Sequence, residues 1–383
     1  MTVEMPDLRN GSRSFRTAVS YSSEIDTIGN DLISQLGAED FAFILLFYGN
    51  RKLPANVVNA VGASYNAPIY GCSTAGELTP AGVSNGAVVA IGFLSKDFGV
   101  ASCLFPDLAN FSIRDAQQLV RQKRDEFVLN RDPNKAHCFA LMLVDGLCYC
   151  EEQLVSAINY GLCDIPLVGG SAGDGMDFNE TSIIYNNEVQ KNSACVLLIE
   201  SACPIHIFKC DSFAPTDVKF VVTKADPENR IVHELNAMPA AMAYAQAIGV
   251  TMEELDLLSF ASHPLCVCFG GDCYVRSIRE VYDDGSFSFY CAIDEGIVFT
   301  LSEVNDMVSG IKATFDNVRA DLGQPQLVLG FDCLLRRMLS EVNQSKAQIN
   351  ELFKANKVIG FNTYGEQVHG MHLNQTFSGI AIG

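Results

Sequence analysis

Apolar runs recur along this chain in one order that is written three times. In each copy a helix-period stretch precedes an apolar strand. A second helix, a short apolar strand, a glycine-bracketed turn ending in a carboxylate and a last apolar strand follow. The copies read FAFILLFY, IYGCSTAGE and GAVVAIGF between residues 41 and 93; CFALMLV, LVGGSAGD and SACVLLIE between 138 and 200; and QLVLGFD, VIGFNTYGE and FSGIAIG between 326 and 383. Repetition of this length marks a structural unit, so it sets the predicted architecture.

The alternation of helices and strands predicts an α/β fold, because such helices cover the faces of sheets. Copies one and two adjoin within residues 15–203 and predict a pseudo-symmetric N-terminal domain of repeated helix–strand–helix–strand units. Residues 205–298 read as short strands, with a hairpin turn at Asp284-Gly285. Together with copy three, this insert predicts an α+β C-terminal domain over residues 204–383. No low-complexity linker separates the two predicted domains, so we expect them to pack together.

Composition narrows the possible partners and location. The chain is 48% hydrophobic and 19% charged, with a formal net charge of −19. This charge argues against a nucleic-acid or anionic-membrane partner, because both need clustered Lys and Arg, and it suits a basic protein partner. The longest apolar runs are about eight residues, against the roughly 20 that cross a bilayer. The N-terminal residues have no apolar h-region, so we expect no signal peptide and a cytoplasmic protein.

The turn GCSTAGE admits two interpretations. Its backbone N–H groups can cradle an anion, or its glycines serve only the geometry of the turn, as repetition in three copies favours. The second glycine comes one residue too late for a nucleophile elbow, and neither a P-loop nor a dinucleotide-binding pattern occurs. We therefore expect a protein that is not an enzyme.

The chain contains 14 cysteines, most of them inside apolar runs, which indicates buried, reduced thiols. Cys266, Cys268 and Cys273 form the spacing C-x-C-x₄-C, and strand alternation puts Cys266 and Cys268 on one face. A zinc or Fe–S site there is the alternative interpretation.

Six segments of the sequence carry a family resemblance: GCSTAGE (71–77), LVGGSAGDG (167–175), HPLCVCFGGDCYVRSI (263–278), DDGSFSFYCAIDEGIV (283–298), LGFDCLLRR (329–337) and FNTYGEQVHGMHLNQTFSGIAIG (361–383). In these segments the chain resembles the FIST sensory-domain family, and within it the haem-binding, nitric-oxide-sensing members. The resemblance covers nearly the whole chain and implies an N-terminal and a C-terminal FIST half.

The resemblance implies a haem b bound through one axial histidine, with nitric oxide binding the iron and a histidine kinase regulated in trans. His372, close to Asn374 and Thr376, and His263, before Pro264, are the candidate haem and metal ligands. The haem propionates need basic partners, and four arginines are candidates: Arg276, Arg279, Arg336 and Arg337.

Two alternatives stay open beside the haem sensor. One is a haem-free module that binds a small ligand such as an amino acid, using the glycine turns, Tyr364, Glu366, His372 and Asn374. The other is a thiol or Fe–S redox sensor built on the three cysteines. The sequence leaves the oligomeric state open, with a homodimer as the commonest case.

Overall fold

The computed structural model describes residues 14–49 and 54–383. The prediction that the chain has no signal peptide concerns residues outside these ranges. The first repeat contains β1 (Phe15–Ser20), α1 (Ile25–Leu36), β2 (Phe41–Tyr48), α2 (Pro54–Ser64), β3 (Ile69–Ser73), β4 (Glu77–Thr79), β5 (Gly82–Ser84) and β6 (Val88–Leu94).

The second repeat has the same order of elements: β7 (Phe98–Phe105), the 3₁₀ turn η1 (Leu108–Asn110), α3 (Ile113–Leu129), β8 (His137–Val144), α4 (Glu151–Leu162), β9 (Leu167–Ser171), β10 (Ile183–Tyr185), β11 (Glu188–Gln190) and β12 (Ala194–Ser201). The third repeat is interrupted after its first strand: β13 (Ile205–Asp211), then α7 (Met307–Leu322), β22 (Leu327–Cys333), α8 (Leu334–Val342), α9 (Lys346–Ala355), β23 (Val358–Thr363), β24 (Glu366–Val368), β25 (Met371–Leu373) and β26 (Thr376–Ile382).

Local sequence explains where the helices begin and end. α1 buries Ile28, Leu32 and Leu36 on one face and ends at Gly37, whose φ of 73° suits a residue without a side chain. At the start of α7, the Asp306 carboxylate accepts hydrogen bonds from two backbone N–H groups. The sequence predicts one continuous helix from residue 334 to 356, but the structure has two. Gln344 adopts a φ of 55° between them, which ends α8.

Each repeat forms one sheet and lends a hairpin to another repeat. Within a repeat, two strands run parallel and the last strand pairs antiparallel to the first of them: β6-β2-β3, β12-β8-β9 and β26-β22-β23. The hairpin β10-β11 of the second repeat extends the first sheet at β3, and β24-β25 of the third extends the second sheet at β9. The hairpin β4-β5 of the first repeat extends the third sheet at β23. The three repeats therefore exchange hairpins in a closed ring.

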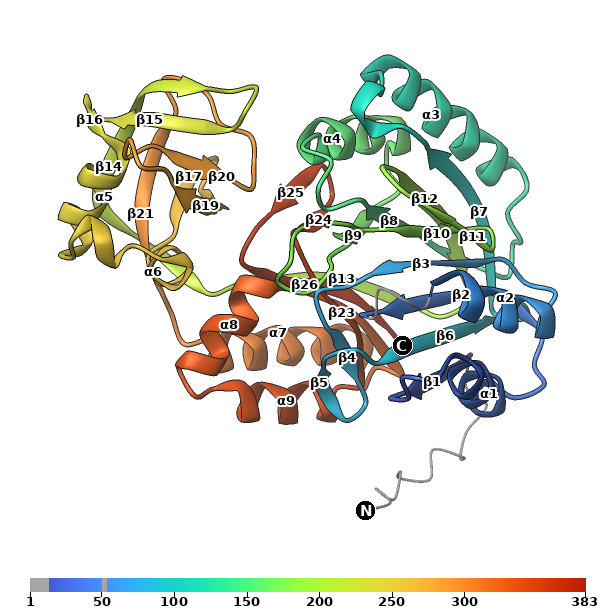
Figure 1. Cartoon of the computed structure of the whole chain (residues 1–383). Coiled ribbons are helices and arrows are strands. Elements are labelled where there is room, and N and C mark those ends of the chain that lie inside the picture. The colour runs from blue at the N-terminus through green and yellow to red at the C-terminus, as the bar shows by residue number, and fades with distance from the viewer. Residues whose placement is uncertain (1–13, 50–53) are drawn as a thin grey trace.

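The three sheets share one hydrophobic core. Their inner faces contribute residues such as Phe47, Leu141, Val168, Phe331 and Phe361 to a single buried cluster, which joins all three repeats. Helices cover the outer faces: α1 and α2 lie on the first sheet, α3 and α4 on the second, and α7, α8 and α9 on the third (Figure 1). The repeated α/β architecture predicted from the sequence is confirmed. The third repeat shares this core with the first two. The sequence predicted a common domain only for the first two repeats and placed the third with the insert.

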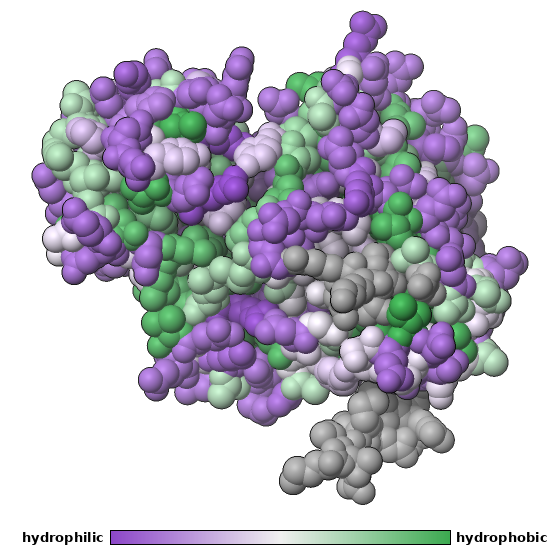
Figure 2. All heavy atoms as spheres, viewed as in Figure 1, coloured by the Kyte–Doolittle hydropathy of each residue, from purple (hydrophilic) through white to green (hydrophobic). Residues whose placement is uncertain are grey.

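The segment between β13 and α7 forms a separate lobe with its own core, here called the insert lobe (residues 213–304). It contains β14 (Phe213–Asp226), β15 (Ile231–Leu235), β16 (Met238–Pro239), α5 (Ala240–Ile248), η2 (Met252–Glu254), α6 (Leu257–Ser262), β17 (Leu265–Phe269), β18 (Asp272–Arg276), β19 (Ile278–Val281), β20 (Phe287–Phe289) and β21 (Val298–Val304). Its strands pair antiparallel and form a sheet separate from the three sheets of the repeats. Figure 2 shows a notch between the upper part of this lobe and the three-repeat body.

One cysteine prediction needs correction. Cys268 and Cys273 form a disulfide in the hairpin between β17 and β18, and Cys268 is exposed, so these two are not buried thiols. The remaining cysteines among the described residues are free, and most of them are buried or half-buried as predicted.

Candidate functional site

The three glycine turns meet and are tied together by backbone hydrogen bonds. We name them the first turn (residues 73–76), the second turn (171–174) and the third turn (362–365). The bonds between them run from Ala75 N to Asn362 O (3.0 Å), Asn362 N to Gly76 O (2.7 Å), Gly173 N to Ser73 O (3.1 Å) and Ser171 N to Gly365 O (2.8 Å). Segments almost 300 positions apart in sequence therefore form one connected platform.

Close strand contacts explain the glycine that precedes each turn. Gly71, Gly169 and Gly360 lie directly opposite a residue of the parallel neighbouring strand. A Cβ at these positions would lie 1.8, 2.1 and 1.9 Å from the carbonyl oxygen of that residue. No side chain fits in that space, so these glycines serve the architecture.

The carboxylates that end the first and third turns are also architectural. Glu77 accepts hydrogen bonds from the Thr74 hydroxyl (2.6 Å) and from Ala87 N (2.9 Å), where the last strand of the repeat begins. Glu366 accepts from Thr376 N (3.1 Å) in the equivalent place. Burial raises the pKa of Glu77 to about 7 and that of Glu366 to about 8. Glu366, predicted to bind a ligand, is fully buried and holds its turn to β26.

The second repeat differs, and its difference creates a polar group at the turns. Here Asp145 accepts the hydrogen bond from the last-strand segment, through Asn192 N (3.0 Å). Asp174 instead accepts from Asn179 N (2.9 Å) and from the hydroxyl of Tyr364. Burial works against its ionisation, but these hydrogen bonds outweigh it and hold the pKa of Asp174 below its usual range. Tyr364, a predicted site residue, thus links the third turn to the second.

A cleft opens beyond the carboxyl ends of β2 and β3, beside the platform. It consists of two adjoining cavities of about 360 and 140 Å³, which share Gly49, Thr74 and Asp174. Other lining residues bring both charge and apolar surface: Ser73, Glu180, Ser182, Lys191, Met176, Leu334, Arg337, Met338 and Glu341. Ligands of open α/β sheets bind at this end of parallel strands. We call this space the turn cleft.

Arg337 is the cation that reaches the turn cleft from α8. Its Nη1 lies 3.3 Å from the carbonyl oxygen of Ala75 and 3.4 Å from Asn362 Oδ1, and its Nε lies 3.5 Å from Glu341 Oε1. A Cβ at Gly76 would lie 2.2 Å from Nη1, so this glycine leaves room for the guanidinium. Arg337 was considered from the sequence only as one of four propionate partners.

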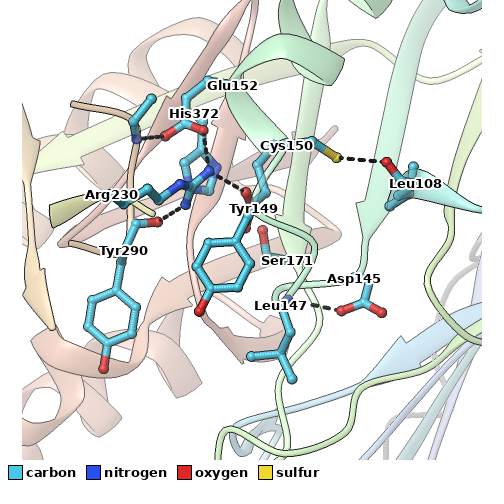
Figure 3. Close-up of polar contacts among 12 residues, drawn as sticks. Leu108, Asp145, Leu147, Tyr149, Cys150, Glu152, Ser171, Arg230, Tyr290 and His372 are labelled. Atoms are coloured by element: carbon cyan, nitrogen blue, oxygen red, sulfur yellow. Dashed lines mark hydrogen bonds and ion pairs between the residues drawn. The ribbon is translucent and has the colours of Figure 1, made fainter. Parts of the chain in front are cut away.

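A second polar cluster joins the insert lobe to the body. Figure 3 shows Arg230 between Tyr290 and Glu152, beside the ring of Tyr149. Its Nη1 donates to Tyr290 O (2.6 Å), and its Nη2 lies 3.0 Å from Glu151 and 2.9 Å from Glu152, at the start of α4. Burial raises the pKa of Glu151 to about 7 despite the guanidinium. Sequence reasoning missed this cluster, whose one signal was two adjacent glutamates opening a predicted helix.

His372 lies in this cluster, on β25, and is almost completely buried. Gln367 Nε2 is 3.1 Å from His372 Nδ1, and because an amide nitrogen only donates, Nδ1 accepts. Burial lowers the pKa of His372 to about 4, so the ring is neutral at pH 7. Two further predicted site residues have buried polar atoms with no hydrogen-bond partner among the residues that the structure describes. These atoms are Oδ1 of Asn374 and the Nε and Nη1 atoms of Arg276, which ends β18.

The other predicted residues lie elsewhere. His263 directly follows α6 in the insert lobe, with Nδ1 3.4 Å from Ser259 O. Arg336 is buried and donates to Asp332 (3.0 Å) and to the Ser212 hydroxyl (2.6 Å). The structure therefore brings His372 near Arg276, but it places His263 and Arg336 in separate surroundings.

The surroundings of His372 do not fit a haem. The lone pair of Nδ1 is occupied by Gln367, and charged Glu152, Arg230 and Arg276 surround the ring. A Cβ at Gly365 would lie 2.3 Å from His372 Cε1, so backbone closes against the ring. A haem needs an accessible imidazole nitrogen and an apolar slot, whereas this ring is almost completely buried, its Nδ1 is already hydrogen-bonded, and charged groups lie nearby.

Two protein-family models match this sequence, and together they cover most of the chain. The FIST N domain matches residues 42–238, and the FIST C domain matches residues 240–369. The chain belongs to the FIST family. The two FIST domains indicate a sensory role in signal transduction.

A relative of this FIST protein is the "Uncharacterized protein MJ1623" of Methanocaldococcus jannaschii, 24% identical over 264 residues, which cover 60% of this chain and 51% of the relative. The chain thus spans about half the length of the curated relative it matches. In the part of the chain that the structure describes, every helix is too short or too polar to cross a membrane.

Proposed function

We propose that this FIST protein is a sensor that binds a small zwitterionic ligand, such as a free amino acid, in the turn cleft. The observation that carries the proposal is the pairing of Arg337 with several carboxylates around a cleft of suitable size. A guanidinium holds a ligand carboxylate through charge-assisted hydrogen bonds, and a carboxylate holds an ammonium group. Met176, Leu334 and Met338 supply apolar surface for a side chain.

The platform of three turns explains how a bound ligand can be reported. The first turn comes from the first repeat, Asp174 from the second, and Tyr364 from the third. A ligand that contacts Arg337 and Asp174 therefore contacts groups whose positions depend on all three repeats. A partner in trans, such as a histidine kinase, would then recognise the altered surface, and the net charge of −19 suits a partner with a basic face.

The experiment is titration calorimetry of the full chain with each free amino acid. We expect binding of one or a few of them, weakened about tenfold or more by Arg337→Ala, since one charge-assisted bond is worth about 1.5–3 kcal/mol. Lys354→Ala, on the surface of α9, is the matched control and leaves affinity unchanged. Absence of binding to any amino acid, or equal affinity in Arg337→Ala, contradicts the proposal.

Nitric-oxide sensing through haem b stays a prediction, drawn from the family resemblance. It has its own test, an absorption spectrum after haem reconstitution of wild type, His372→Ala and His263→Ala. A sharp Soret band lost in one variant would support it and identify the ligand. A broad spectrum that neither substitution changes is what the buried, occupied ring of His372 leads us to expect.

A further inference from the structure

The hairpin between β17 and β18 brings three sulfur atoms together at the edge of the insert lobe. Cys268 and Cys273 face each other in register and form the disulfide. Cys266 lies two positions before Cys268 on the same strand, and its Sγ is 3.6 Å from Cys268 Sγ. The three sulfur atoms all lie within 4.8 Å of one another.

The three cysteines differ in access to solvent. Cys268 is exposed and Cys273 is half-buried, close to the turn Gly270-Gly271 at the tip of the hairpin. Cys266 is fully buried, and its Sγ lies 3.0 Å from the Ser302 hydroxyl and 3.4 Å from Thr300 O on β21. A soluble reductant can therefore reach the disulfide, while the sheet fixes the third sulfur beside it.

The separation of the sulfurs matches a thiolate metal site. Zinc–sulfur bonds of about 2.3 Å in a tetrahedral site place neighbouring sulfurs about 3.8 Å apart. The 3.6 Å between Cys266 and Cys268 is close to this value, and four residues separate Cys268 from Cys273, as in many zinc ligand pairs. Fe–S clusters usually take four cysteines, whereas the residues described here supply three, so Zn²⁺ fits better.

We propose that this hairpin is a redox-gated zinc site. A dithiol reductant transfers two electrons and two protons to the Cys268–Cys273 bond, which breaks to give two thiols, while the reductant leaves as its own disulfide. Zn²⁺ then binds the sulfurs of Cys266, Cys268 and Cys273 with loss of their thiol protons to solvent, and a water molecule completes the fourth position. A small-molecule disulfide oxidant then accepts two electrons and leaves as two thiols, while the bond between Cys268 and Cys273 forms again; this removes two ligands and releases the ion.

The site lies beside the contact between the insert lobe and the body. Tyr274 follows Cys273 directly, and its ring lies 5.3 Å below Lys209 Nζ of β13. Arg276, three positions after Cys273, lies near the buried His372. The hairpin that would change between disulfide and zinc-bound forms thus lies next to residues through which the insert lobe contacts the three-repeat body.

The experiment measures Zn²⁺ affinity of the full chain, oxidised and reduced, by competition with a chromophoric chelator. We expect the reduced protein to bind one more equivalent than the oxidised protein. Cys266→Ser and Cys273→Ser in the reduced state each weaken this binding at least tenfold. Co²⁺ in place of Zn²⁺ gives a second readout, a thiolate-to-metal absorption band that depends on the same cysteines.

Cys163→Ser is the matched control, because this exposed free cysteine follows α4 and belongs to the other lobe. It leaves the additional equivalent unchanged. Equal Zn²⁺ binding in the oxidised and reduced protein overturns the proposal, as does reduced Cys273→Ser protein that binds like wild type. Cys273→Ser alters only a half-exposed position, so the test does not depend on whether buried Cys266→Ser folds. None of these outcomes bears on amino-acid binding in the turn cleft.

Discussion

Arg230 Nη2 lies 3.0 Å from Glu151 Oε2, and both side chains are about 95% removed from solvent. Arg230 belongs to the insert lobe and Glu151 to α4 of the second repeat, so this ion pair crosses the contact between the two lobes. The second carboxylate, Glu152, accepts from the same nitrogen. A buried guanidinium between the buried carboxylate of Glu151 and the half-buried one of Glu152 specifies how the lobes meet, because neither Arg230 nor Glu151 can be left unpaired without cost.

Replacement of Arg230 by methionine should destabilise the protein by about 3–5 kcal/mol, because it leaves the buried carboxylate of Glu151 and the half-buried one of Glu152 uncompensated. Urea unfolding followed by circular dichroism measures this free energy. Lys354→Ala, which removes an exposed ion pair on α9, should change it far less. Equal effects of the two substitutions would show that the lobe contact does not depend on this pair.

Stability should decline as pH rises, through carboxyl groups that the fold keeps protonated. Burial raises the pKa of Glu366 from 4.5 to about 8, so the folded state holds a proton that the unfolded chain releases above pH 4.5. This group's contribution is therefore fully present below about pH 4.5 and is lost by about pH 8, with a slope of at most about 1.4 kcal/mol per pH unit. Glu366→Gln should flatten the profile between these limits. Parallel profiles for variant and wild type, from urea unfolding at pH 5 to 8, would contradict this.

Gly169→Ala should destabilise the fold by about 3 kcal/mol, because the new methyl group would meet the carbonyl oxygen of Met142 at 2.1 Å. Gly310→Ala, in α7, is the matched control. Its Cβ would have no neighbour closer than 3.5 Å, and alanine favours a helix. Thermal unfolding compares the two variants, and a stable Gly169→Ala protein would refute the close approach of β8 and β9.

The sequence predicted the repeated elements well, because each apolar run is long enough to show its period. FAFILLFY, CFALMLV and QLVLGFD became β2, β8 and β22 with nearly the expected bounds. The exchange of hairpins was not predictable in this way. The short strands β4, β10 and β24 have three residues each, and nothing in their sequence specifies which sheet they join.

The site was predictable only in part, for a related reason. The turns and Tyr364 were recognised, but the role of Glu366 as a buried anchor depends on Thr376, ten positions away. In the second repeat, Asp145 takes over that anchoring, which leaves Asp174 at the cleft. A substitution of one carboxylate by another from a different strand has no signature in a single sequence.

The closed ring of hairpins makes each repeat incomplete by itself. A chain cut between β12 and β13 would remove β4 and β5 from the edge of β23, and would remove β24 and β25 from β9. Both fragments would present unpaired strand edges, which favour association with other chains. The two domains predicted from the sequence, residues 15–203 and 204–383, are thus interlocked through their hairpins, and the two fragments, expressed separately, should regain their structure only when mixed.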